Sequence, residues 1–478
     1  MDPQSAHLHT NHVVALTDIV GDRGILSGSE TEAYEQGARF DKGKAAFVLR
    51  PGSTDELSEA VAYSVRNNIH LVPQAGNTGV VSASTPDASG TQAILSVDRL
   101  NKLIELDRDN RSVRVGAGVL LSDLNTALEP DGLFFPIDLG SDPRIGGMVA
   151  TNTGGARFLK YGDVRRNVLG LTVVLADTEG TVLKFGRGLR KDNTGVDWKQ
   201  IFIGTSGFFG VVTECILNVE RLPRETATAF LVPAGSQQVM PLLRALEDRF
   251  GSDLTAFEGM SGSSIRAALE HVPSLRNPFP KGEVPDYVIL LELSRSRPAR
   301  DGGEPLDAEL ESALAEIWEL SEPLLSDAFI GPAQEMWALR HAISEGVKVL
   351  GVLVAFDLAF RRGDVMAFCD RVKAELPARF PDVGAYEFGH VADGGIHFNL
   401  VARNDSDSAG DPQFERSLRE WVYDIAVNDY GGSFSAEHGI GRNNQTFYNK
   451  FTPETTRRMA GRLKEIISPG GLGTVRLD

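Results

Sequence analysis

Two glycine-rich stretches decide the fold: Pro73-Gln-Ala-Gly-Asn-Thr-Gly79 and Pro136-Ile-Asp-Leu-Gly-Ser-Asp-Pro-Arg-Ile-Gly-Gly-Met-Val-Ala-Thr-Asn-Thr-Gly-Gly155. The first directly follows a predicted strand, and small residues continue after it to Ser84. Such runs expose backbone N–H groups and let a pyrophosphate approach the chain closely. A tight surface loop or dense backbone packing would use the same residues, so both alternatives stay open on the pattern alone.

The segments around these stretches predict an α+β fold. A β-α-β unit is expected from the strand Ala45–Arg50, a helix capped by Thr54 that runs to Asn67, and the strand His70–Pro73. From Arg221 onward longer helices alternate with strands. We expect strands near 226–232, 254–259, 286–294 and 352–360, and helices near 236–250, 306–326 and 364–377. This order is typical of an antiparallel sheet with helices on one face.

Composition narrows the class of function and the compartment. The 478 residues include 48 Lys plus Arg and 65 Asp plus Glu, and the net charge of −17 argues against nucleic acid as a partner. Cys215 and Cys369 fit neither a disulfide framework nor a zinc–cysteine site, and we interpret them as inert packing residues. Met1–Val20 lacks the pattern of a secretion signal. We therefore predict a cytoplasmic protein, with peripheral membrane association left open.

Ordinary nucleotide-binding motifs are missing from the sequence. The near-matches to G-x-G-x-x-G, Gly116-Ala-Gly118 and Gly439-Ile-Gly441, lack the third glycine, and no G-x-x-x-x-G-K-[ST] occurs. Both facts argue against a nicotinamide or nucleoside-triphosphate fold.

Histidines and acids gather in two blocks near the C-terminus, Gly389–Asn399 and Ser433–Gly441. On one continuous strand His390 and His397 would face opposite ways, but Asp393-Gly-Gly395 is a turn signal that would let both imidazoles converge. Two imidazoles and a carboxylate suit Zn²⁺ or another divalent metal, and a further histidine could accept a proton. Hydrogen-bonded structural histidines are the alternative.

A predicted helix over Glu335–Ser344 carries Arg340 and Ser344 four residues apart, on one face. The planar guanidinium of an arginine can hold a carboxylate through two hydrogen bonds. Most arginines on helices are simply solvated, so this pattern alone does not assign a site.

Together these blocks resemble the FAD-binding domain of the vanillyl-alcohol-oxidase-type flavoproteins and, within them, the FAD-linked D-2-hydroxyacid dehydrogenases. The resemblance runs from about Asp41 to Arg442 and includes further blocks at 156–163, 168–177 and 189–195. It implies a two-subdomain FAD-binding domain plus an antiparallel-sheet substrate (cap) domain. We predict an N-terminal segment (1–40), the FAD-binding domain (41–222), the substrate domain (223–430) and a C-terminal segment that completes the active site (431–478).

The resemblance also implies the residues that hold FAD, of which the first stretch would bind the pyrophosphate and the second would line the flavin. These residues are Pro73, Gln74, Ala75, Gly76, Asn77, Thr78, Gly79, Ser82, Pro136, Gly146, Gly147, Thr151 and Gly155. Some relatives attach the flavin through a histidine in the first loop. No histidine lies between His70 and His271 here, so we expect non-covalent FAD.

The blocks near the C-terminus resemble the family's active-site motifs. They imply His390, His397 and Glu437 as ligands of a divalent metal, Zn²⁺ first and Mn²⁺ as the alternative, and His438 as the catalytic base. Arg340, Ser344 and Asn399 would bind the substrate. The implied reaction oxidises a D-2-hydroxyacid, D-2-hydroxyglutarate or D-lactate-like, to the 2-oxoacid with hydride transfer to flavin N5. Electron-transferring flavoprotein, a quinone or a cytochrome would accept the electrons, and a homodimer stays open.

Three departures from the family pattern stand out. Ser206 replaces the acid of a G-S-E-G-T-L-G block, Ala355 stands where the hydroxyglutarate enzymes tend to carry a lysine, and residues 468–478 lack a recognisable Asn-Pro-Gly. Lys348 or Lys160 are candidates to replace the missing cation. Two rival functions remain: an oxidase of the same fold that uses O₂, and a non-catalytic metal-binding subunit of a flavoprotein complex.

Overall fold

The predicted β-α-β unit is present near the start of the computed structural model, which describes residues 3–39, 41–297 and 303–478, with side chains from residue 11. Its cap differs from the prediction. The side chain of Ser53, and not that of Thr54, accepts the hydrogen bond from the Glu56 N–H, at 3.1 Å. Ser53 has the extended backbone of an N-cap, whereas the Thr54 hydroxyl bonds to that of Thr213 at 3.0 Å.

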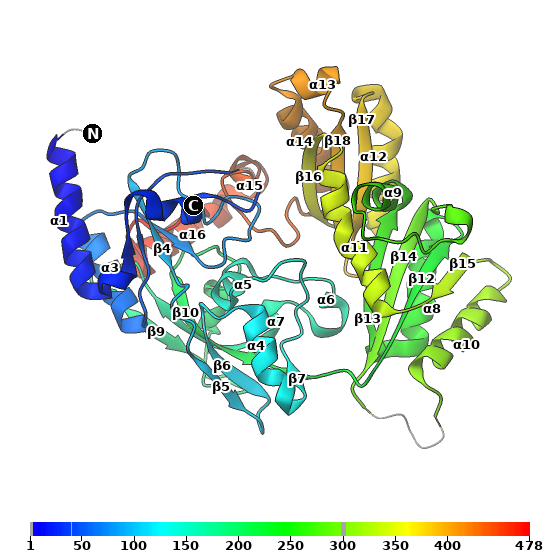
Figure 1. The fold of residues 1–478 in the computed structure, drawn as a ribbon, viewed down its shortest axis with the longest axis horizontal. Coiled ribbons are helices and arrows are strands. Elements are labelled where there is room, and N and C mark those ends of the chain that lie inside the picture. The colour runs from blue at the N-terminus through cyan, green and yellow to red at the C-terminus, as the bar shows by residue number, and fades with distance from the viewer. Residues whose placement is uncertain (1–2, 40, 298–302) are drawn as a thin grey trace. The chain divides into compact units, whose positions relative to one another are not determined.

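The structure divides into two compact units (Figure 1). Unit 1 contains the described residues up to Gly154, Asp163–Leu222 and Glu437–Asp478, and unit 2 contains Gly155–Gly162 and Pro223–Ala436. Unit 2 is thus inserted into the sequence of unit 1.

Unit 1 holds two principal sheets. The first has the order β1-β2-β4-β3, in which β2, β4 and β3 are parallel and β1 is antiparallel. The second is antiparallel throughout, with the order β5-β6-β10-β8-β9. The strands of the two sheets are β1 (Ile25–Leu26), β2 (Ala45–Leu49), β3 (Leu71–Gln74), β4 (Gln92–Ser96), β5 (Ile104–Asp107), β6 (Ser112–Gly116), β8 (Val168–Val174), β9 (Val182–Phe185) and β10 (Val211–Asn218).

Helices and short segments cover these sheets. β7 pairs with β11 as a small separate ladder. The elements are α1 (Pro3–Val20), α2 (Glu32–Glu35), α3 (Thr54–Arg66), α4 (Leu121–Leu128), β7 (Leu133–Phe134), α5 (Ile145–Thr151), α7 (Val164–Asn167), β11 (Glu220–Arg221), α15 (Gln445–Phe451) and α16 (Glu454–Ile467).

The C-terminal segment is built into the first sheet. Leu472 forms a parallel bridge with Leu71 of β3, the edge strand of that sheet. Leu472 is 1% exposed and joins the apolar cluster that holds Leu16, Leu57 and Val61. Residues from both ends of the sequence therefore share one core.

Unit 2 is one seven-stranded antiparallel sheet with the order β15-β12-β14-β13-β17-β18-β16, together with its helices. The strands are β12 (Glu225–Pro233), β13 (Leu254–Ser261), β14 (Tyr287–Arg295), β15 (Leu325–Ile330), β16 (Val352–Ala359), β17 (Val383–Gly389) and β18 (Gly395–Ala402). The helices are α6 (Phe158–Tyr161), α8 (Val239–Phe250), α9 (Gly262–His271), α10 (Leu306–Trp318), α11 (Ala333–Lys348), α12 (Val365–Arg379), α13 (Asp407–Gly410) and α14 (Phe414–Asp424).

Helices lie on both faces of this sheet, and not on one as predicted. Phe388 of β17 belongs to the apolar cluster of α9 and α11, whereas its neighbour Glu387 binds Lys373 of α12 at 2.6 Å. Adjacent residues of a strand face opposite sides, so α11 and α12 cover different faces. The helix predicted over 306–326 ends at Trp318, and β15 follows. Pro323 is incompatible with a helix continued to residue 326, because its ring would clash with the Glu319 carbonyl and it has no N–H to donate.

Among the described residues, none of the helices combines the length and the apolar character that a membrane crossing requires.

Candidate active site

The first glycine-rich stretch of unit 1 leaves β3 as a loop held by its own polar side chains. The Gln74 amide donates to the backbone oxygens of Tyr34 and Ser84, both at 2.9 Å. Asn77 has a positive φ of 52° and donates to the Gln36 carbonyl at 2.8 Å. A Cβ at Gly79 would meet no atom within 4 Å, so the loop presents bare backbone to open space there.

The second stretch meets the first. A Cβ on Gly147 of α5 would lie 3.1 Å from Ala75 Cβ, and one on Gly76 would lie 3.2 Å from the Arg144 nitrogen. Gly146 instead faces Ala117, whose Cβ a new methyl would approach to 2.6 Å. The structure thus gives Gly146 a packing reason to be glycine.

The remaining predicted FAD residues do not all lie in unit 1. Pro136 is buried two residues after β7, and the Thr151 hydroxyl donates to the Gly147 carbonyl at 3.0 Å. Gly155 has a positive φ of 91° and belongs to the short segment of unit 2.

Two further loops of unit 1 join this region. Ser206, the residue that replaces the family's acid, has a positive φ of 50° and donates its N–H to Ala150 O at 2.7 Å. A Cβ at Gly441 would lie only 2.0 Å from Val81 O, so the loop after His438 runs against the first stretch. Four loops of one unit therefore converge: residues 73–82, 143–154, 204–210 and 439–443.

The C-terminal tail, in which the sequence shows no recognisable cofactor motif, also reaches these loops. The Thr474 hydroxyl donates to the Ala83 carbonyl at 2.8 Å, and the Ser82 hydroxyl donates to Asn443 Oδ1 at 3.2 Å. Ser82 also has a positive φ, of 62°. The tail therefore supports the loop that is predicted to bind the pyrophosphate. No local sequence pattern indicates this contact.

In unit 2 the chain reverses at the predicted turn. β17 ends at Gly389, and β18 begins at Gly395. His390 and His397 converge, with ring centroids 5.4 Å apart and ligand nitrogens within 4.8 Å of each other. Asp393 Oδ1 accepts the Gly395 N–H at 2.9 Å and stabilises the turn.

His390 contacts a carboxylate that the sequence analysis missed. Glu258 of β13 places Oε1 2.6 Å from His390 Nδ1, while its Oε2 accepts bonds from Arg340 Nε at 3.0 Å and Nη2 at 2.8 Å. Burial alone would raise the pKa of Glu258, but His390 and Arg340 lower it to about 2. The Arg340 guanidinium also lies over the ring of Phe388, 4.6 Å from its centroid.

His397 has a carboxylate neighbour of its own. Asp357 lies opposite it in the β16–β18 ladder, with Oδ1 3.6 Å from His397 Nδ1. Asp357 Oδ2 and the Asp357 carbonyl accept the Ala436 N–H, at 3.0 and 3.1 Å. The last residue of unit 2 is therefore fixed beside Asp357, and Glu437 is joined to it by a peptide bond.

Glu437 and His438 are half-buried in the loop that begins the last part of unit 1. The loop is fixed after them, because Asn444 donates to the Gly439 carbonyl at 2.9 Å and accepts the Gly441 N–H at 2.9 Å. Both residues stay predictions as metal ligand and base.

The predicted substrate residues of unit 2 differ in environment. Arg340 is 7% exposed, whereas Ser344, one turn later on α11, is exposed. Asn399 is buried and donates to the Tyr386 carbonyl at 3.2 Å. Ala355 pairs with Asn399 across the ladder, so the missing lysine would have stood beside it.

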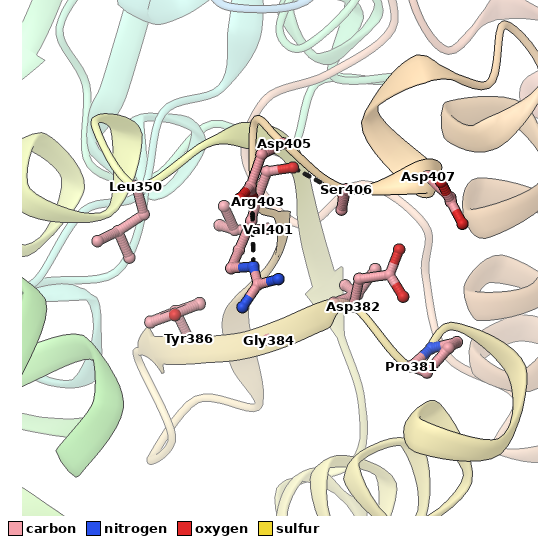
Figure 2. A pocket seen from close by; sticks show the side chains of 11 residues that line it. Leu350, Pro381, Asp382, Gly384, Tyr386, Val401, Arg403, Asp405, Ser406 and Asp407 are labelled. Atoms are coloured by element: carbon pink, nitrogen blue, oxygen red, sulfur yellow. Dashed lines mark hydrogen bonds and ion pairs between the residues drawn. The ribbon is translucent and has the colours of Figure 1, made fainter.

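A hollow of about 590 Å³ lies where β17 begins and β18 ends, at the opposite end of this strand pair from His390 (Figure 2). Arg403 projects into it, with Nε 3.5 Å from Asp405 Oδ1, and Asp382 and Asp407 add two carboxylates. Arg403 follows His397 by six residues, about 20 Å along a strand. An excess of carboxylates suits an anionic substrate poorly, and no residue predicted from the sequence lines this hollow.

Comparisons with known proteins agree with the predicted family. The model of an FAD binding domain matches residues 45–186, and that of the C-terminal domain of FAD linked oxidases matches residues 222–472. A probable mitochondrial D-2-hydroxyglutarate dehydrogenase of Oryza sativa subsp. japonica is 34% identical, over 98% of this chain and 82% of the relative. The chain belongs to the FAD-linked D-2-hydroxyacid dehydrogenases. The mitochondrial D-2-hydroxyglutarate dehydrogenase of Bos taurus is 33% identical, over 96% and 82% of the two chains.

Solved structures confirm the fold of this dehydrogenase. A substrate-bound p-cresol methylhydroxylase aligns with a TM-score of 0.71 at 13% identity, over 96% of this chain and 94% of that chain. The 4-ethylphenol oxidase of Gulosibacter chungangensis aligns with a TM-score of 0.70 at 16% identity, over 98% and 96%. These structures and the family models confirm the predicted α+β class. The family models and the curated relatives confirm the FAD cofactor and the enzyme class.

The predicted cytoplasmic location is wrong. Relatives from Oryza sativa, Arabidopsis thaliana and Bos taurus are named as mitochondrial enzymes. The prediction rested on scarce cysteines and on the lack of a secretion signal, and neither feature distinguishes the cytoplasm from another compartment without disulfide formation. The cysteines do behave as predicted, because both are buried and burial raises the pKa of each thiol.

Proposed function

We propose that this dehydrogenase oxidises a D-2-hydroxyacid of the D-2-hydroxyglutarate or D-lactate kind to the 2-oxoacid, with a divalent metal assisting removal of the hydroxyl proton. One observation carries the proposal: a buried arginine and two converging histidines, Arg340, His390 and His397, are connected on one face of a single sheet. A guanidinium recognises a carboxylate, and imidazoles bind a metal that can bind a hydroxyl. A 2-hydroxyacid carries both groups on neighbouring carbons.

The loops of unit 1 fit the pyrophosphate of FAD, and the lack of a histidine between His70 and His271 supports binding without a covalent link. Bare backbone at Gly79 and positive φ at Asn77 and Ser82 are what a chain needs where a pyrophosphate approaches it. FAD, when bound, supplies the acceptor for the hydride that leaves substrate C2. We assign the pyrophosphate to residues 73–79 and Ser82, and the flavin to the second stretch.

The donor set fits a divalent metal. His390 has Nδ1 against a carboxylate, the arrangement that metal-ligating histidines usually have, and His397 has a carboxylate neighbour as well. Glu437 completes the set in our proposal because it directly follows the anchored Ala436. Such a metal, Zn²⁺ or Mn²⁺, supplies positive charge that favours the ionised hydroxyl.

Three side chains then act on the substrate. Arg340 binds the C1 carboxylate of the substrate through Nη1 in our proposal. Glu258 holds the guanidinium by Nε and Nη2, and neither of these bonds uses Nη1. His438 accepts the hydroxyl proton in our proposal, and Asn399 contributes a polar contact. The electrons leave through a separate acceptor such as electron-transferring flavoprotein, a quinone or a cytochrome.

Anaerobic visible spectra of the purified protein test this function. We expect the flavin band to bleach on addition of D-2-hydroxyglutarate, D-lactate or D-malate, and the fastest of the three to define the substrate. A chelator should slow the bleaching, and Zn²⁺ or Mn²⁺ should restore it. A flavin that none of the three bleaches would refute the proposal, whereas rapid reoxidation in air would favour the oxidase alternative.

Replacement of His438 tests the base. His438→Asn should keep the flavin spectrum and lower the rate of flavin reduction by about 100-fold or more, as expected for loss of a general base. His271→Asn is the matched control, because His271 bonds only along its own helix, to the Ala267 carbonyl at 3.1 Å. Equal rates in the two variants would remove His438 from the mechanism.

A further inference from the structure

We infer that Glu258 is a positioning residue for the reaction: its single carboxylate holds His390 by one oxygen and Arg340 by the other, and so fixes the metal-binding and substrate-binding groups relative to each other. This inference rests on the proposed function, because it gives a purpose to contacts between residues that the proposal assigns to metal and substrate.

The first observation is how completely the carboxylate is used. Glu258 has a side chain 1% exposed, its Oε1 lies 2.6 Å from His390 Nδ1, and its Oε2 accepts two N–H groups of Arg340. A buried carboxylate requires hydrogen bonds and opposite charge, and this one has both. Neither partner is near in sequence, since 132 residues separate Glu258 from His390 and 82 separate it from Arg340.

The second observation concerns which atoms remain for chemistry. With Nδ1 of His390 against Glu258, the histidine offers Nε2 as the metal ligand, and the carboxylate fixes both ring orientation and tautomer. Arg340 is held along its Nε–Nη2 edge and stacked on Phe388, which fixes the plane of the guanidinium. The planar fork then points in one direction only.

The third observation is that the three residues come from three different elements. Glu258 lies on the central strand β13, Arg340 on α11, and His390 in the turn after β17. β13 pairs with β17 only through Gly259 and Met260. The contact between Glu258 and His390 adds a side-chain link beside this short ladder. A displacement of α11 against the turn must break one of these bonds.

Glu258→Gln is the decisive variant. Glutamine has nearly the same shape but only one acceptor oxygen, so it can serve His390 or Arg340 but not both. We expect the Kd for Mn²⁺ or the KM for the bleaching hydroxyacid to rise by about tenfold or more, the usual effect of losing such a partner. The flavin spectrum and thermal melting establish that the variant is folded.

Glu387→Gln is the matched control. Glu387 is an equally buried carboxylate of the same sheet that pairs with a cation, Lys373, on the opposite face. It should lower stability and leave both Kd and KM unchanged. If the Glu258→Gln variant fails to fold, Glu258→Asp keeps the charge and both oxygens but withdraws them by one methylene, and it should raise the same two constants.

The outcomes separate the two proposals. Wild-type protein that binds no Mn²⁺ and bleaches with no hydroxyacid refutes the proposed function, and with it this inference. The inference is overturned, and the proposed function is kept, by a different result: the wild type binds Mn²⁺ and is bleached by a hydroxyacid, and a folded Glu258 variant has the same Kd and KM as Glu387→Gln. A rise in either constant that is absent from Glu387→Gln supports it.

Discussion

Gly441→Ala should disable the reaction while leaving the cofactor in place. The added Cβ would lie 2.0 Å from the Val81 carbonyl oxygen, and ordinary contact begins at 3.4 Å. Because the obstacle is backbone, and Thr474 holds the adjoining Ala83 carbonyl at 2.8 Å, we expect the loop of Gly441 to retreat by more than an ångström while the first glycine-rich loop stays in place. The proposed base, His438, lies three residues earlier on the same loop. Misplacement by about 1 Å can cost about 100-fold in rate, and we expect that loss here.

The assay is the anaerobic rate of flavin bleaching at saturating hydroxyacid, compared with the FAD content of the purified variant. Gly235→Ala is the control, since its Cβ would meet no atom within 4 Å and its φ of 177° suits any residue. Wild-type bleaching by a folded Gly441→Ala variant would refute the argument, and so would an equal loss in Gly235→Ala.

Three further predictions concern the cofactor, a buried lysine and the substrate. Acid precipitation should release all the FAD into the supernatant, and a yellow pellet would contradict non-covalent binding. Burial lowers the pKa of Lys464 from 10.5 to about 8, so the unfolded chain binds more protons between these values. The difference in free energy of unfolding between wild type and Lys464→Met should therefore shift in favour of wild type by up to about 3 kcal/mol from pH 8 to 10.5. Urea titrations at each pH measure this difference, and a value that does not change with pH would contradict the prediction. Ala355→Lys should raise the ratio of kcat/KM for D-2-hydroxyglutarate to kcat/KM for D-lactate by about tenfold, the effect of one added hydrogen bond between charged groups. An unchanged ratio would contradict the placement of the distal carboxylate of hydroxyglutarate beside residue 355.

Local patterns in the sequence predicted local structure well. The turn at Asp393-Gly-Gly395 brings His390 and His397 together as expected, because turn chemistry is decided within a few residues. The helix that carries Arg340 is present and is longer than predicted. The predicted cap of α3, Thr54, is one residue too late, because Ser53 and Thr54 carry similar hydroxyl side chains and only the backbone conformation distinguishes the cap.

Contacts between distant segments were not predictable. Glu258 lies in an apolar strand pattern, and nothing near it in the sequence signals a partner 132 residues away. The same holds for Thr474, whose contact at Ala83 joins residues 391 apart. Helices on both faces of the unit 2 sheet were missed because the order of elements does not define the side on which each helix packs.

The insertion of unit 2 into unit 1 determines the order in which a nascent chain can fold. Leu472, which bridges to the edge strand β3, is synthesised only after the whole of unit 2. Until then β3 has unpaired backbone groups along one edge, and such an edge readily pairs with another chain. The sequence of unit 2 is therefore complete before that of unit 1, and we expect chains interrupted before residue 472 to leave this edge of β3 open to pairing with another chain.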